Sequence, residues 1–131
     1  MTEKQTIQLN VGTQYDNQFG KGKIDLELVR LHCEMLFKHA GVISLPYTSR
    51  WISDSGAEYN EKCIAAKITL AVPLTIEQIE ARIEHLRKNV KQSAIAFATE
   101  YLGNTYADVY YGPVKPEDGY NFDPAEFHYV K

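Results

Sequence analysis

An arginine beside the single tryptophan, Arg50-Trp51, is the pair best suited to ligand chemistry in this chain of 131 residues. A guanidinium can pair with a phosphate while an aromatic ring stacks on a base, so the pair can hold a nucleotide. Neighbouring residues of a strand, however, point to opposite sides of the sheet. We therefore expect Trp51 in the core and Arg50 at a surface or an interface, with a ligand clamp as the alternative.

A glycine-rich loop, Phe19-Gly20-Lys21-Gly22-Lys23, precedes the expected start of a helix. Free backbone amides, the helix dipole and two lysines can together receive a phosphate there. The Walker A spacing GxxxxGK[ST] is absent. We expect a flexible connection, and anion binding by Lys21 and Lys23 is the alternative.

Motifs for metal binding and catalysis are missing. His32 and His39 are seven residues apart rather than the four of HExxH, and no GxSxG nucleophile elbow occurs. The second expected helix carries acidic residues beside Arg and Lys at the spacing of a salt-bridged surface, namely Glu77, Glu80 and Glu84. We therefore expect a protein that is not an enzyme and that uses no metal or cofactor.

Composition narrows the class of partner. The chain is 44% apolar and 24% charged, as in ordinary globular domains, and 14 Lys plus Arg against 17 Asp plus Glu give a net charge of -3. No positive field favours nucleic acid, no segment reaches the roughly 20 apolar residues of a membrane span, and no secretory signal is apparent. We expect a cytoplasmic location, with Cys33 and Cys63 as small buried hydrophobes.

Alternating hydrophobicity predicts four strands, at residues 7–15, 42–53, 59–72 and 105–111. In the second strand we expect Leu45, Tyr47 and Trp51 to share one side. In the third, the side opposite the core is unusually small, which favours close approach of a partner or ligand: Cys63, Ala65, Lys67, Thr69 and Ala71.

Helical spacing predicts two helices. The first runs from Ile24 to a stop at Gly41, after a loop at residues 16–23. The second opens with a capping box, Thr75 to Gln78, and we expect it to continue to about residue 102 because no Gly or Pro interrupts it. Residues 92–99 can also be read as a strand, since Ile95 and Phe97 alternate with alanines.

This order predicts an α+β fold, a ferredoxin-like β-α-β-β-α-β antiparallel sheet with helices on one face. We expect one domain at residues 1–112 and an aromatic C-terminal arm at 113–131 that packs on its own or a neighbouring subunit. The open sheet face would hold a ligand or be covered in a homo-oligomer. Candidate ligand-binding residues, beside the pair and the lysines above, are Asn10, Thr69, Tyr106 and Tyr110, and the polar set expected on the open face also includes Gln8, Gln14 and Lys67.

Several segments resemble phage proteins that counter Thoeris immunity by sequestering its cyclic ADP-ribose-type signal. They are Ile7–Thr13, Thr48–Trp51, the turn around Gly56 with Glu58, and Ile64–Leu70, about half of the chain. The resemblance implies a homo-oligomer that encloses a cyclic nucleotide without cleaving it, and no binding residue is transferred from the family. The alternatives are a protein-interaction or assembly module and a small ferredoxin-like enzyme.

Overall fold

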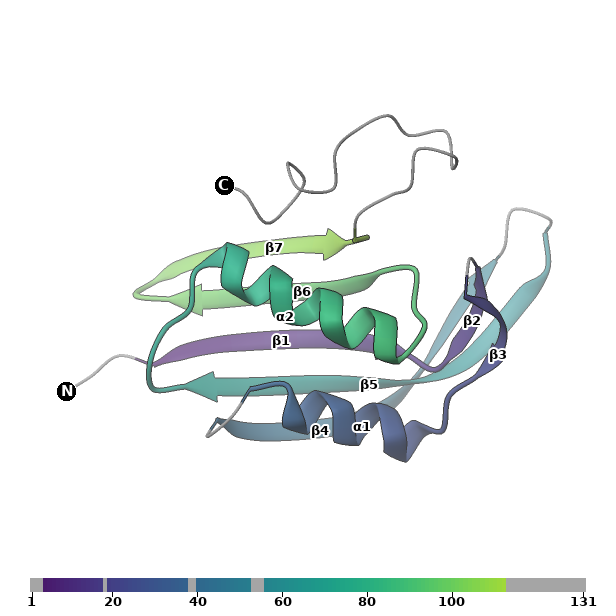
Figure 1. Cartoon of the computed structure of the whole chain (residues 1–131), viewed down its shortest axis with the longest axis horizontal. Helices are drawn as coiled ribbons and strands as arrows, with labels where there is room; N and C mark the ends of the chain where they lie inside the picture. The colour runs from purple at the N-terminus through teal and green to yellow at the C-terminus, as the bar shows by residue number, and fades with distance from the viewer. Residues whose placement is uncertain (1–3, 18, 38–39, 53–55, 113–131) are drawn as a thin grey trace.

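The computed structural model of the chain describes residues 4–17, 19–37, 40–52 and 56–112. Within them, strands and helices follow one another as Figure 1 shows. The strands are β1 (Gln5–Gly12), β2 (Gln14–Asn17), β3 (Gly20–Lys23), β4 (Gly41–Ile52), β5 (Glu58–Leu70), β6 (Ile95–Tyr101) and β7 (Asn104–Tyr110). The helices are α1 (Leu26–Met35) and α2 (Ile76–Asn89). The expected arm, residues 113–131, lies outside the described part.

Five strands form one antiparallel sheet in the order β4-β5-β1-β6-β7. Both helices lie on the same face of this sheet, α2 over β6 and β1, and α1 over β5 and β4 (Figure 1). The expectation of an α+β fold with an antiparallel sheet and helices on one face is thereby confirmed. No described element covers the opposite face, which we call the open face.

The core lies between the helices and the sheet. Alternation along β1 buries Ile7, Leu9 and Val11 completely, because every second side chain points toward the helices. Alternation likewise buries Ile64, Ala66, Ile68 and Leu70 along β5, whereas Val72, the last residue of the strand predicted at 59–72, follows the end of β5 and is exposed. Helix α2 supplies its apolar stripe to this core: Ile79, Ile83 and Leu86.

The capping box at the start of α2 is confirmed. The backbone amide of Gln78 donates to Thr75 Oγ1 at 3.2 Å, and the backbone amide of Thr75 donates to Gln78 Oε1 at 2.9 Å. The two side chains satisfy amides that the first turn of a helix leaves without partners. They therefore fix where α2 begins over the sheet.

The predicted continuation of this helix to residue 102 is wrong. Helix α2 ends at Asn89, and Lys91 adopts a left-handed conformation, φ 56°, which reverses the chain. Residues 95–101 instead form β6, paired with β1 on one side and β7 on the other. The turn between β6 and β7 uses two left-handed residues, Leu102 and Gly103, the geometry that suits a two-residue hairpin. Pairing on both sides outweighs the helical reading of this segment.

The predicted loop at residues 16–23 is also wrong in part, because β2 and β3 pair there as a hairpin. Asn17 anchors its turn. Its Oδ1 accepts from the backbone amide of Phe19 at 2.8 Å, and its Nδ2 donates to Lys91 O at 3.0 Å and to Ser93 Oγ at 2.9 Å. These bonds tie the β2–β3 hairpin to the segment that follows α2.

The side of β4 that we expected to carry Leu45 and Tyr47 into the core is in fact the open face. Ile43 and Leu45 are 67% and 63% exposed, and they pair across to Lys67 and Ala65 of β5. Strand β4 lies at the edge of the sheet, where only Val42 packs against the core cluster. The side chain of Trp51 is outside the described part of the structure.

Among the described residues, neither helix has the length and hydrophobicity that crossing a membrane requires.

Candidate functional site

The open face has a floor of small side chains at its centre. Asn10 of β1 lies between Ala65 of β5 and Ala96 of β6, and Gln8 lies between Lys67 and Ala98. Because these alanines end at Cβ, a flat molecule can approach the sheet closely. The small side predicted for β5 is confirmed to face away from the core.

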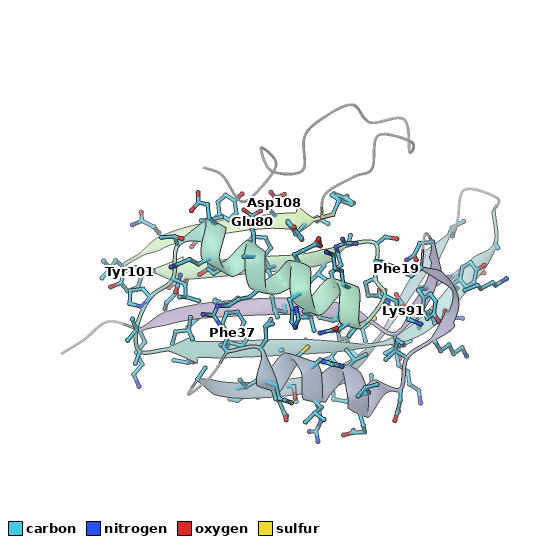
Figure 2. All side chains as sticks on the ribbon, viewed as in Figure 1. Phe19, Phe37, Glu80, Lys91, Tyr101 and Asp108 are labelled. Atoms are coloured by element: carbon cyan, nitrogen blue, oxygen red, sulfur yellow. The ribbon has the colours of Figure 1, made fainter. Side chains whose placement is uncertain are left out.

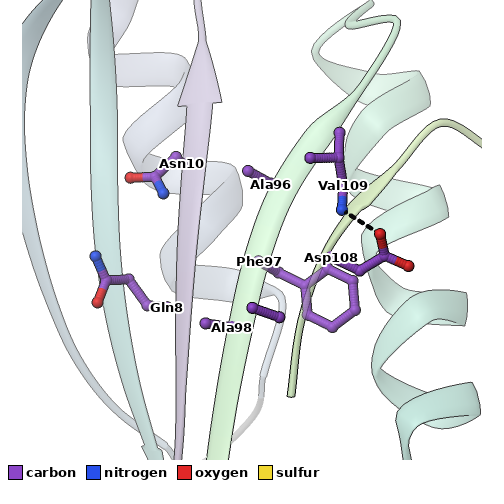
Figure 3. Close-up of a pocket in the computed structure, with 8 residues that line it drawn as sticks. Gln8, Asn10, Ala96, Phe97, Ala98, Asp108 and Val109 are labelled. Atoms are coloured by element: carbon purple, nitrogen blue, oxygen red, sulfur yellow. Dashed lines mark hydrogen bonds between the residues drawn. The ribbon is translucent and has the colours of Figure 1, made fainter. Parts of the chain in front are cut away.

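Two hollows on this face join into a single groove. One, of about 490 Å³, is lined by Gln8 and Asn10 of β1 and by alanines, Phe97, Asp108 and Val109 of β6 and β7 (Figure 3). The other, of about 770 Å³, reaches from β7 to β4 and to the β2–β3 hairpin. Both include Asn10, Ala96 and Val109, so we call them together the open-face groove.

The carboxylate of Glu61 lies in the larger hollow of this groove. Its Oε2 accepts from the backbone amides of Thr13 at 3.3 Å and Gln14 at 3.0 Å, where the chain passes from β1 to β2. Thr13 is fixed in turn, because its hydroxyl donates to Lys62 O at 2.7 Å. The end of β1 therefore holds the carboxylate in place with main-chain donors.

Gly12 makes room for this carboxylate. A Cβ at Gly12 would lie 2.9 Å from both carboxylate oxygens of Glu61 and 2.8 Å from Oε1 of Gln92. Gln92 is only 7% exposed, and its Nε2 donates to Gln14 O at 3.0 Å. A residue without a side chain is thus required at position 12 if both groups are to occupy these positions.

Two further groups beside Glu61 stay protonated near neutral pH. Burial, followed by the neighbouring Cys63 and Glu61, raises the pKa of Tyr47 to about 12. Burial and then Glu61 also raise the pKa of the Cys63 thiol, which shares a hydrogen bond with Tyr47. Tyr47 is therefore a neutral hydrogen-bond donor, and neither group is an activated nucleophile.

The charge of the larger hollow is negative. Among the described residues that line it, Glu61 carries the only charge and no Lys or Arg occurs; the lining residues are Asn10, Gly12, Gln14, Tyr15, Asn17, Tyr47, Ser49, Glu61, Cys63, Gln92, Ser93, Ala94, Ala96 and Val109. Two cations contact lining residues from outside the lining. Lys91 Nζ donates to the Tyr15 hydroxyl at 3.5 Å, near the β2–β3 hairpin (Figure 2), and Arg87 Nη1 donates to Gln92 O at 3.2 Å. The groove therefore suits a cationic or neutral ligand better than a phosphorylated one.

Of the predicted ligand-binding residues whose side chains the structure describes, only Asn10 lines this groove. Thr69 lies on the open face but beside Thr6 and Gly41, outside the lining. Arg50 is exposed near the end of β4 and pairs with Glu58. Lys21 and Lys23 project from the exposed strand β3 and do not line the groove.

Tyr106 and Tyr110, two further predicted ligand-binding residues, do not line the open-face groove. Tyr110 is fully buried in the core, and Tyr106 packs on the buried ring of Phe97 with centroids 5.9 Å apart. Both lie on the helix side, because β7 places its even-numbered residues there. The Tyr106 hydroxyl donates to Asp108 Oδ2 at 3.2 Å, which accounts for its polar end.

Sequence reasoning missed Glu61, Gln92, Gly12 and Tyr47. A usable signal existed for Glu61, which is two residues before Cys63 and therefore on the same small side of the predicted strand. Gln92 carried no such signal because its segment was assigned to a helix. Among the described residues, no group of His, Cys, Asp and Glu is arranged to hold a metal ion.

The chain matches no protein-family model and no curated protein. Two solved structures resemble it. A phage SAM lyase in the apo state is 17% identical with a TM-score of 0.54, over 84% of this chain and 89% of that one. A phage SAM lyase in complex with S-methyl-5′-thioadenosine is 16% identical with a TM-score of 0.50, over 80% of this chain and 88% of that one. At these identities the likeness concerns the fold.

This likeness corrects the expectation that the protein is not an enzyme, because the structures that share its fold are those of an enzyme, phage SAM lyase. That expectation rested on the lack of a nucleophile, a base pair or a metal motif. Those motifs serve chemistry in which the protein supplies the reacting group. A reaction within one bound molecule needs none of them.

Proposed function

We propose that the protein is a lyase that binds S-adenosylmethionine in the open-face groove and releases S-methyl-5′-thioadenosine. The observation that carries this proposal is the lone carboxylate of Glu61 in a hollow whose described lining contains no cation. S-adenosylmethionine carries two positive groups, its sulfonium and its α-ammonium, and either can lie beside this carboxylate. Two opposite charges about 4 Å apart attract by about 4 kcal/mol at an effective dielectric constant of about 20, which is enough to favour a cation over a neutral analogue.

The charge also weighs against a diphosphate. A cyclic ADP-ribose-type signal would bring negative phosphates beside Glu61, and no Lys or Arg lines the hollow in the described part to offset them. Sequestration of such a signal, the function implied by the resemblance in sequence, stays a prediction. The likeness in fold supports the lyase instead.

The shape of the groove suits an adenosyl group. The alanine floor between Asn10 and Val109 leaves room for the flat face of a purine (Figure 3). Side-chain amides can read the edge of adenine by paired hydrogen bonds, and Gln8 and Asn10 supply two of them here. Tyr47 and Tyr15, at the other end, offer aromatic faces beside Glu61.

The reaction balances without a protein nucleophile. An oxygen of the substrate's own carboxylate bonds to its γ carbon while the carbon–sulfur bond breaks, and the electron pair leaves with sulfur. The products are S-methyl-5′-thioadenosine and homoserine lactone, and no proton, electron or water is exchanged. Since a cation and an anion neutralise each other in this step, a desolvated groove favours the transition state over the separated charges.

We also infer a homo-oligomer and retain the ferredoxin-like description for β4, β5, β1, β6 and the two helices, with β7 added at the edge. Large apolar side chains remain exposed on the open face along β4: Ile43 and Leu45 are 67% and 63% exposed. A second copy covering them would close the groove against water. Enclosure is what the charge-neutralising step requires.

The test is turnover of S-adenosylmethionine by the purified full-length chain. We expect S-methyl-5′-thioadenosine and homoserine lactone in equal amounts by mass spectrometry, at a rate well above spontaneous decomposition without protein. Glu61→Gln should lower the rate at least about tenfold, as loss of a charge-assisted contact does. Glu58→Gln is the matched control, since that carboxylate pairs with exposed Arg50. Decomposition no faster than without protein would contradict the proposal.

A further inference from the structure

Three acceptor oxygens converge in front of Gly12. Both oxygens of Glu61 and Oε1 of Gln92 lie 2.8–2.9 Å from the point where a Cβ of residue 12 would be. Because Gly12 has no side chain, the space beyond that point opens into the larger hollow, which all three residues line. The oxygens belong to strands and loops far apart in sequence, so the fold assembles them.

The amide of Gln92 has a fixed orientation. Its Nε2 donates to Gln14 O at 3.0 Å and to Val90 O at 3.4 Å, so Oε1 must turn the other way, toward Gly12. The side chain is 93% buried, being 7% exposed. Because Gln92 lines the larger hollow, this acceptor can receive a hydrogen bond from a donor bound there.

We propose that the Gly12, Glu61 and Gln92 cluster binds the α-ammonium group of the substrate, which rests on the proposed function and names a subsite within it. An ammonium has three donors and one positive charge, which match three acceptors that share one negative charge. The sulfonium has no N–H or O–H and gives Gln92 nothing to accept. A divalent ion is a poorer match, because such ions take more carboxylate oxygens at shorter distances.

Placement of the ammonium here orients the reacting chain. The amino group and the carboxylate share the α carbon, so holding one restricts where the other can reach. With the adenosyl group on the alanine floor and the ammonium at Gly12, the three-carbon chain must span between them. Restriction of that kind favours ring closure onto the γ carbon.

The experiment compares three uncleavable probes by calorimetry on the full chain. S-adenosylhomocysteine carries the α-ammonium, S-(3-carboxypropyl)-5′-thioadenosine lacks only that group, and S-methyl-5′-thioadenosine lacks the amino-acid part entirely. We expect wild type to prefer the first over the second by about 10- to 100-fold, the range of charge-assisted hydrogen bonds. Gln92→Leu should reduce this preference to about threefold or less and leave the affinity for the third probe unchanged within about twofold.

Gln8→Leu is the matched control, a glutamine of the smaller hollow whose loss should weaken all three probes equally. If Gln92→Leu does not fold, Glu61→Gln provides the second variant and should also reduce the preference. A wild type without preference, or a preference that survives these variants, overturns the proposal. So does an equal loss for all three probes, since Gln92 would then contact adenine or ribose. If no probe binds wild type, the proposed function itself fails and this subsite with it.

Discussion

Gly12 determines the geometry of the site because it has no side chain. A methyl group there would meet the carboxylate of Glu61 and the amide of Gln92 at distances below 3.0 Å. We expect Gly12→Ala to displace both and to lower the affinity for S-adenosylhomocysteine at least about tenfold, while overpacking lowers the free energy of unfolding by about 1–3 kcal/mol. Calorimetry and chemical denaturation measure the two effects.

Gly41→Ala is the matched control, because a Cβ at Gly41 meets no atom within 4 Å. It should leave affinity unchanged. Wild-type affinity in Gly12→Ala would show that the position of the carboxylate does not matter.

Tyr47 should titrate late. Its pKa in the folded state is raised to about 12 from the ordinary 10.0 of a tyrosine, so the folded state holds the proton more tightly than the unfolded state. The associated stability is therefore fully present below pH 10 and is lost as the pH rises from 10 to about 12. In a difference absorbance titration of wild type against Tyr47→Phe, we expect this phenol to ionise near pH 12. Ionisation near 10 would mean that Tyr47 is not desolvated beside Glu61.

Most individual residues of the site could not be predicted from the sequence. Asn10 was predicted because alternation along β1 places it opposite buried Leu9. Glu61 looked like any polar strand residue until the β1–β2 junction brought two backbone amides to it. Arg50 and the tyrosines were favoured for their chemistry, yet pairing in the sheet decides which face a side chain reaches. Residue type alone does not show which face of the sheet a side chain occupies.

At the level of elements, the β6–β7 hairpin begins where we predicted that the second helix would continue to about residue 102. Its turn holds Gly103 at φ 80°, a left-handed conformation that costs other residues about 1–2 kcal/mol. We expect Gly103→Ala to lower the free energy of unfolding by about that amount, since no atom lies within 4 Å of the added Cβ and only backbone strain acts. Gly103→Asn should cost less, because Asn tolerates this conformation. Equal stability of Ala and wild type would contradict the hairpin turn.

Strand and helix order was predictable where one pattern dominated. The core strand β1 alternates cleanly, and the capping box marks the start of α2. Residues 95–101 fit both the helical and the strand pattern of hydrophobicity, because alanine is tolerated on a buried and on an exposed face. They form a strand because β1 and β7 pair with them on either side. The edge strand β4 was placed with the wrong face inward, since apolar residues there lie on the open face instead.

At the scale of the whole molecule, the exposed face of β4 links assembly to binding. Leu45→Glu adds a charge where we infer a second copy to pack, so we expect it to shift the chain toward monomer in size-exclusion chromatography with light scattering. Affinity for S-adenosylhomocysteine should fall with it as the groove loses its cover. Lys67→Glu, across from Ile43 on the same face, is the comparison variant. It changes the charge of this face but leaves the apolar side chains of β4 in place, so it distinguishes an effect of charge from the loss of an apolar contact. A wild type that is monomeric at all concentrations would contradict the oligomer.

The central claim is that an adenosyl ligand with a positive charge binds beside Glu61, and amide chemical-shift mapping tests it most directly. In two-dimensional NMR of the labelled chain, titrated S-adenosylhomocysteine should shift the amides of Gly12, Thr13 and Gln14 and those around Ala96, and should leave those of α1 in place. The Glu61→Gln variant should require at least about ten times more ligand for the same shifts. Shifts confined to the helices, or none at saturating ligand, would contradict a binding site on the open face.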